Sequence, residues 1–160
     1  MTELTDFEQR IVANVEKHGC HVMSVFDPDG ELPEFTYSIG FPETVGQPEV
    51  IIFGLSSDIR HSMVNETLRL CRDGLVLEDG EQVSGLLEGH YCIAREVPSC
   101  AIDAEHFGSA IWFNRHIGHG GLARAFQIVW PGALNGLFPW DKGAGQEVID
   151  AQPALYEAAA

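Results

Sequence analysis

The segment of residues 35–55 constrains the fold of this chain more than any other. It contains two apolar runs, at 35–39 and 50–53, joined by a polar stretch that has two prolines and the glutamates Glu43 and Glu49. A continuous apolar run such as Val-Ile-Ile-Phe is typical of a central strand with both faces covered. Loops held by a rigid sheet often carry functional residues. The segment therefore predicts a buried sheet with a candidate site where its strands end.

Two longer helices are predicted, one before and one after this segment. Thr5-Asp-Phe-Glu8 has the form of a capping box and is followed by apolar residues at helical spacing, which indicates a helix over about 5–18. Ser56-Ser57 and Gly74 are typical start and stop signals for a second helix, over about 57–72. A third, shorter helix is predicted over 104–113.

The other apolar segments are predicted to be strands. The turn sequence Asp27-Pro-Asp-Gly30 joins two of them, 21–26 and 35–39, as a hairpin. Further strands are expected at 50–53, 90–97 and 125–130, with a short one near Val83. Residues 40–49 and 115–121 are predicted to be loops, and the segment after 131 to be irregular.

Hairpins combined with helices favour an α+β fold, with a mostly antiparallel mixed sheet packed by two to three helices. A half-open barrel is the alternative arrangement of the same strands. With 160 residues, the chain is long enough to bury its own core as a single domain. We expect residues 5–150 to form the globular core and 151–160 to form a tail.

The charge of the chain limits its partners. Nine Lys and Arg residues against 24 Asp and Glu residues give a net charge of −15. Such a chain repels phosphate backbones and anionic membrane surfaces, so we expect no nucleic-acid or membrane partner. No apolar run is long enough to span a bilayer. The charge fits a small polar or cationic ligand, a basic protein partner or a divalent metal. The simpler interpretation is that the charge only keeps the protein soluble.

The cysteines predict a reducing compartment. The chain has four, Cys20, Cys71, Cys92 and Cys100, and no two form a Cys-x-x-Cys pair. The N-terminus lacks a charged start followed by an apolar stretch, so no secretory signal is expected. We therefore predict a cytoplasmic protein with reduced, mostly buried cysteines and no disulfide.

Several segments together resemble a bacterial family of uncharacterised proteins, domain of unknown function 4262. The resemblance implies a small cytosolic bacterial protein and no particular activity. Members of that family often have a histidine before the Pro-Glu pair, where this chain has Gln47, so chemistry that needs a histidine there is not expected. The matching segments are 19–22, 37–40, 48–55, 107–108, 127–131 and 138–140.

No cofactor is expected, and the candidate metal ligands are weak. His90 and Cys92 are two residues apart on a predicted strand and therefore point to the same face. His116 and His119 share a predicted loop. A zinc site needs three or four such ligands that converge, and the sequence has no closely spaced ligand motif that predicts one. The glycine-rich stretch 118–121 lacks the Lys-Ser/Thr ending of a phosphate-binding loop.

Candidate catalytic groups are Glu43, Glu49 and His21. Two carboxylates brought close together would raise the pKa of one of them and give an acid/base pair. The simpler interpretation is that these are solvated loop acids. Cys20 and His21 are neighbours on a strand and face opposite ways, so they cannot form a dyad. No Gly-x-Ser-x-Gly motif is present to expose a serine.

The candidate ligand-binding residues are aromatic and acidic. Tyr37, Trp130 and Trp140 stand at predicted strand ends or in loops, where such rings suit pockets. Together with Glu43 and Glu49 they are predicted to form one concave, acidic face. We expect a small binding or regulatory module, and the alternative is a small hydrolase or isomerase that uses loop carboxylates or a histidine. Whether the protein is an enzyme stays open at this point.

Overall fold

Six strands form one sheet in the computed structural model, which describes residues 3–158. The strands are β1 (His21–Val25), β2 (Phe35–Ile39), β3 (Glu49–Phe53), β4 (Glu81–Leu87), β5 (His90–Val97) and β6 (Ala125–Val129). Their order across the sheet is β1-β2-β3-β6-β5-β4. The pair β3–β6 is parallel, and the other four pairs are antiparallel. The sheet is open, because the outermost strands β1 and β4 do not pair with each other.

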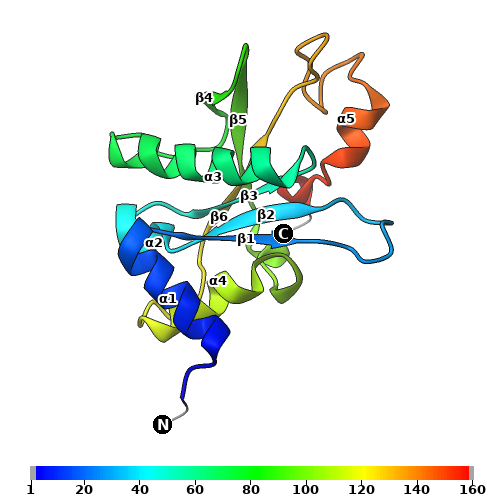
Figure 1. The fold of residues 1–160 in the computed structure, drawn as a ribbon. Helices are drawn as coiled ribbons and strands as arrows, with labels where there is room; N and C mark the ends of the chain where they lie inside the picture. The colour runs from blue at the N-terminus through cyan, green and yellow to red at the C-terminus, as the bar shows by residue number, and fades with distance from the viewer. Residues whose placement is uncertain (1–2, 159–160) are drawn as a thin grey trace.

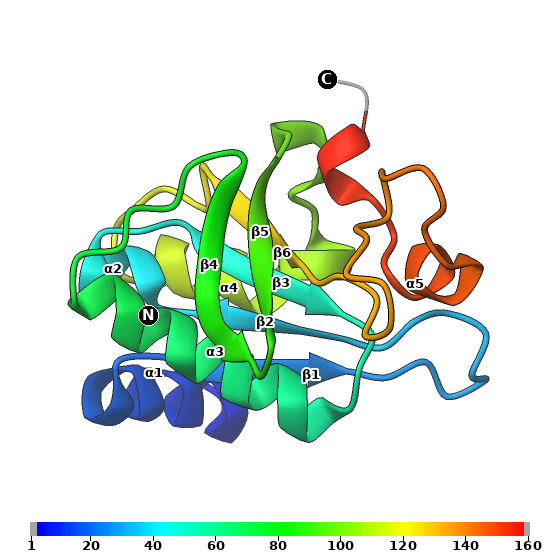
Figure 2. The same ribbon diagram turned by 90° about the horizontal axis from the view of Figure 1, so that it is seen from above.

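Helices cover both faces of this sheet. The bounds of the helices are α1 (Asp6–His18), α2 (Phe41–Val45), α3 (Ser57–Arg72), α4 (Ala104–His116) and α5 (Gln146–Ala151), and those of the 3-10 turns are η1 (Ser99–Ala101) and η2 (Leu155–Glu157). In Figure 1, α3 lies above β1 and β2, while α1 and α4 lie below them. The sheet is strongly twisted, since β4 and β5 stand upright in that view while β1 and β2 run across it. Figure 2 shows α3 and the β4–β5 hairpin from above, on the side nearest the viewer. The mixed sheet with helices on both faces is the α+β fold predicted from the sequence.

The central strand is covered on both faces, as its apolar run predicts. Val50 and Ile52 belong to the core cluster that includes Met63 of α3. Ile51 and Phe53 point the other way, into a second cluster that includes residues of α1 and α4. Because successive strand residues alternate in direction, one strand serves both cores.

The predicted signals set the ends of the two longer helices. The Thr5 hydroxyl accepts a hydrogen bond from the Glu8 N–H at 3.1 Å, and the Glu8 carboxylate accepts one from the Thr5 N–H at 2.9 Å. Gly19 ends α1 with a left-handed φ of 93°. The hydroxyl of Ser56 accepts the N–H of Ile59 at the start of α3.

Four segments differ from the prediction. The expected loop 40–49 contains the short helix α2, which starts because Pro42 fits the first turn of a helix. The strand near Val83 is seven residues long, and α4 continues to His116 rather than ending at 113. The segment expected to be irregular contains α5 and η2.

The segment predicted as a tail is attached to the sheet. The side chain of Gln127 on β6 donates to the Pro153 carbonyl at 2.9 Å and accepts from the Leu155 N–H at 3.1 Å. Tyr156 is buried against the same region. Residues up to 158 are therefore part of the packed structure, while 159–160 lie outside the described residues.

One buried arginine holds the turn between β3 and α3. The guanidinium of Arg60 is inaccessible to solvent and donates to the carbonyls of Gly54 and Leu55 at 2.9 and 2.7 Å. It also donates to the Thr36 hydroxyl and pairs with Glu34 at 3.4 Å. Leu55 has a positive φ of 60°, a conformation that non-glycine residues seldom adopt. The two carbonyl contacts keep this turn in place.

None of the helices in residues 3–158 is both long enough and apolar enough to cross a membrane.

Candidate functional site

A buried carboxylate organises one end of the sheet. Glu49, the first residue of β3, is fully buried and accepts four hydrogen bonds. The donors are the Ser38 hydroxyl at 2.7 Å, the Gly40 N–H at 2.7 Å, the Phe41 N–H at 3.0 Å and the Asn114 side-chain amide at 3.2 Å. Glu49 thus connects the end of β2, the start of α2 and the last turn of α4.

The pKa of Glu49 reflects two opposed effects. Removal from water favours the neutral acid, whereas each of the four donors favours the carboxylate. Burial is the larger effect and raises the pKa of Glu49 to about 7. The side chain has no exposed surface, and it lines neither the pocket that opens beside it nor the cavity between α1 and α3. Glu49 is therefore enclosed by its own donors, and its position suits a structural role better than contact with a substrate.

A pocket of about 310 Å³ opens beside this network and is referred to below as the Asn114 pocket. Its wall combines the segment around α2 with the end of α4 and the loop that follows it. The residues that matter for its chemistry are Pro42, Gln47, Pro48, Asn114, His119 and Arg124.

Asn114 has an unused acceptor. Its amide nitrogen donates to Glu49 and to the Ala110 carbonyl, the latter at 2.7 Å. Its Oδ1 atom is buried and has no hydrogen-bond partner within residues 3–158. A buried carbonyl oxygen left without a donor costs about 1–3 kcal/mol. Since Asn114 also lines the pocket, a donor held in the pocket is the natural partner for this oxygen.

A histidine of the pocket wall is paired with an acid that is not itself part of the wall. Glu43 on α2 and His119 in the loop after α4 are joined by a contact of 3.1 Å between Oε2 and Nε2. Both side chains are about half exposed. Two other polar side chains of the wall each make one contact: Arg124 Nε pairs with Glu96 at 2.8 Å, and Gln47 Oε1 accepts from the Leu77 N–H at 2.9 Å.

The aromatic residues predicted to bind a ligand do not lie together beside Glu43 and Glu49. The sequence prediction that all five residues form one concave face is therefore wrong. Tyr37 is buried under α4, where its hydroxyl accepts the Ser109 N–H at 3.1 Å. Trp130 is buried on the opposite face of the sheet, and its indole N–H donates to the Phe53 carbonyl at 2.7 Å. Trp140, 38% exposed, lies over Arg95.

The direction of β6 explains this separation. The strand begins at Ala125, which pairs with Glu49 in the parallel register. It ends at Val129, so Trp130 and the residues after it continue from the opposite end of the sheet. The two tryptophans therefore lie away from the Asn114 pocket.

The histidine and cysteine candidates are also scattered. His21 contacts the Asn14 amide at 2.9 Å, and its pKa is lowered mainly by burial. Cys92 is fully buried in the core, which raises the pKa of its thiol to about 12. The ring of His116 stacks on Trp112 with centroids 5.1 Å apart. Within residues 3–158, the weak metal candidates His90, Cys92, His116 and His119 form no cluster that could hold a metal ion.

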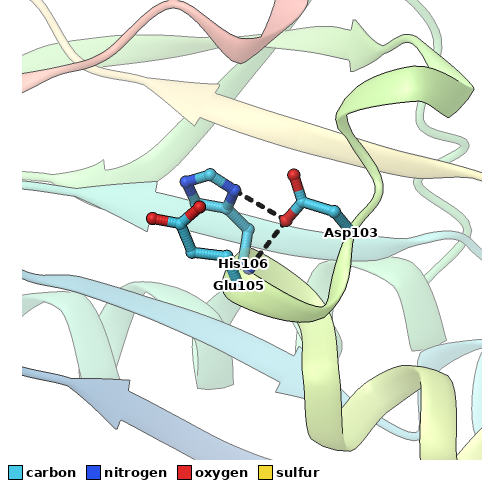
Figure 3. A group of neighbouring side chains, drawn as sticks. All are labelled: Asp103, Glu105 and His106. Carbon is cyan, nitrogen blue, oxygen red and sulfur yellow. Dashed lines mark hydrogen bonds and ion pairs between the residues drawn. The ribbon is translucent and has the colours of Figure 1, made fainter.

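A different cluster was not predicted from the sequence. Potential ligand atoms of Asp103, Glu105 and His106 lie within 4.8 Å of one another at the start of α4, as Figure 3 shows. Asp103 Oδ1 accepts the His106 N–H at 3.0 Å and contacts His106 Nδ1 at 2.9 Å. Helix capping accounts for Asp103 and for the orientation of His106, so the arrangement is explained without a metal.

Comparison with known proteins identifies the family. A family model described as a domain of unknown function (DUF4262) matches residues 14–145, which include every residue of the Asn114 pocket. The chain therefore belongs to this family, and the resemblance stated from its sequence segments is confirmed. No curated protein and no solved structure gave a match.

Proposed function

We propose that this member of the DUF4262 family is a small binding module whose Asn114 pocket takes a ligand with a hydrogen-bond donor, such as an amine. The observation that carries the proposal is the buried Oδ1 atom of Asn114, which has no partner within the described residues and belongs to a side chain that lines the pocket. A ligand N–H group would satisfy this oxygen. An oxyanion would meet it as a second acceptor and would be rejected.

Charge favours a cationic form of this donor. The chain carries a net charge of −15, and Glu43 contacts the wall residue His119 at 3.1 Å. The one arginine of the wall, Arg124, is paired with Glu96. The ligand is accordingly a small ammonium compound or the basic side chain of a protein partner, and nucleic acids and anionic membranes are not expected partners.

Thermal unfolding in the presence of matched small molecules tests the proposal. Propylammonium should raise the unfolding temperature with a saturable dependence on concentration, whereas propionate should not. Glu43→Gln should weaken this response by about threefold, since the charge of an exposed carboxylate is partly screened by solvent. Glu105→Gln removes an exposed carboxylate at the other end of α4 and is the matched control.

If propylammonium raises the unfolding temperature of Glu43→Gln as much as that of the unmodified protein, Glu43 has no role in binding. Equal stabilisation by propylammonium and propionate would contradict the donor-selective pocket itself.

The second candidate function is a small hydrolase or isomerase. It is favoured by the contact between Glu43 and His119, because a carboxylate that orients a histidine is a common arrangement for general acid–base catalysis. Turnover of small ester, amide or epimerisable substrates that disappears in both His119→Gln and Glu43→Gln would support it. Turnover that persists in both variants would contradict it.

We also place the protein in the cytoplasm of a bacterium. Support comes from Cys20, Cys71 and Cys92, three separate buried thiols whose pKa values are raised by burial to about 12, 11 and 12. Such thiols suit a reducing compartment. Alkylation of the denatured, unreduced protein should modify all four cysteines, and a smaller number would contradict the prediction that no disulfide is present.

A further inference from the structure

A second cavity lies between α1 and α3 and shares no residue with the Asn114 pocket. Its volume is about 590 Å³, and it is referred to below as the α1–α3 groove. Buried or partly buried apolar side chains form its floor: Cys20, Val22 and Leu68. Polar side chains, most of them basic, form its rim: Asn14, His18, His61, Asn65, Arg69 and Arg72.

The two arginines of the rim differ in how many ion pairs and hydrogen bonds they make. Arg69 is ion-paired with Glu66 and Asp73, at 2.9 and 3.0 Å. Arg72 has no carboxylate partner within residues 3–158, and its one hydrogen bond there is a long contact of 3.5 Å with the His18 carbonyl. Arg72 therefore keeps most of its five N–H donors available at the groove.

Several basic groups gather in this region although the whole chain is strongly acidic. His21 directly follows the groove residue Cys20 in the chain. Burial is the largest cause that lowers the pKa of His21, and the charges of Arg10 and His61 are the next largest. Burial dominates the rise in the pKa of the Cys20 thiol; the charge of Glu49 adds to this rise, and the charge of Arg72 opposes it. Two acids on α3 and at its end, Glu66 and Asp73, are paired with Arg69.

We propose that the α1–α3 groove binds a small organic anion that combines an oxyanion with an apolar group. The oxyanion, a phosphate or a carboxylate, lies against Arg72 between His18 and His61. The guanidinium of Arg72 offers the paired donors that match an oxyanion. The apolar group rests on the floor made by Val22 and Leu68. This site is separate from the Asn114 pocket and does not depend on its proposed ligand.

Titration followed by nuclear magnetic resonance tests this site with three probes that share one ring: phenyl phosphate, phenylacetate and benzylamine. At least one of the two anions should shift the imidazole signals of His18 and His61 saturably, while benzylamine should not. Arg72→Gln should weaken the binding of that anion about tenfold, as expected for loss of a charge-assisted hydrogen bond. Arg115→Gln removes an arginine from α4, on the other face of the sheet, and should leave binding unchanged.

His61→Gln provides a second variant at an exposed position, where folding is not at risk, and should weaken binding by a smaller factor. Whichever anion binds identifies the phosphate or the carboxylate as the preferred group. The proposal is overturned if neither anion gives a saturable shift, if benzylamine binds as well as the anions, or if Arg72→Gln and His61→Gln both bind like the unmodified protein.

Discussion

At the scale of single residues, Glu49 shows how a buried acid can be retained in a core. Its carboxylate has four donors and no basic partner within the described residues, so hydrogen bonds offset only part of the cost of its removal from water. Two of the donors are backbone N–H groups, which cannot rotate away or become acceptors. The side chain is therefore matched to its surroundings by shape and donor geometry, while burial keeps its pKa raised to about 7.

This pKa predicts an unusual pH dependence of stability. Because the pKa is higher in the folded protein than in the unfolded chain, the stabilising contribution of Glu49 is fully present below about pH 4.5 and is lost as the pH rises through about 7. Relative to Glu49→Gln, the unmodified protein should lose roughly 3 kcal/mol of unfolding free energy between these pH values. Denaturant unfolding of both proteins across this range measures the difference, and a difference that does not change with pH would contradict the prediction.

A substitution of Ser38, one of the donors, tests the hydrogen-bond network around Glu49. Its hydroxyl donates to Glu49 and accepts the Val50 N–H at 2.9 Å. Ser38→Ala should lower the unfolding free energy by about 1–3 kcal/mol, since it leaves two buried groups without their partner. It should also raise the pKa of Glu49 further. Ser62→Ala, at an exposed position of α3, is the control, and equal effects of the two substitutions would count against the network.

At the scale of elements, the turn from β3 to α3 depends on a side chain from inside the following helix. Arg60 donates to two consecutive carbonyls of this turn and so satisfies backbone acceptors that neither the strand nor the helix can pair. The same guanidinium reaches Thr36 on the neighbouring strand. One residue thus fixes the position of α3 over the sheet.

Arg60→Met should therefore be strongly destabilising. The methionine retains part of the buried volume but leaves the Gly54 and Leu55 carbonyls without donors, and we expect a loss of roughly 2–4 kcal/mol. Arg69→Met is the matched control, because Arg69 is exposed and its ion pairs lie at the surface, where they contribute little. Urea unfolding compares the two, and similar midpoints for both variants would refute the role of Arg60.

At the scale of the whole molecule, local signals predicted most elements but not the site. The capping box at Thr5 predicts a helix start and the apolar run at 50–53 predicts a buried strand, each from neighbouring residues alone. Both predictions are confirmed. Glu43 and Glu49 were predicted to line one concave face; in the structure Glu43 lies on α2 and Glu49 begins β3, and their predicted roles in binding or catalysis stay predictions. The expectation that Trp130 and Trp140 lie beside them was wrong, since it required knowing which end of β6 faces Glu49.

The remaining residues of the site come together only through tertiary structure. The parallel pairing of β3 with β6 brings the end of α4 next to residues that are about 65–76 positions earlier in the chain. Asn114 lies in a segment with no local motif, so its buried, unpartnered oxygen could not be read from the sequence. His119 was noted only as a weak metal candidate, because its partner Glu43 belongs to a distant segment.

A crystal structure of the protein grown with propylammonium tests the central claim most directly. The account predicts an ammonium group in the Asn114 pocket, with its nitrogen about 2.9 Å from Asn114 Oδ1, while the wall residue His119 keeps its contact with Glu43. Density for the ligand only outside this pocket, or a pocket without ligand at a saturating concentration, would contradict the account.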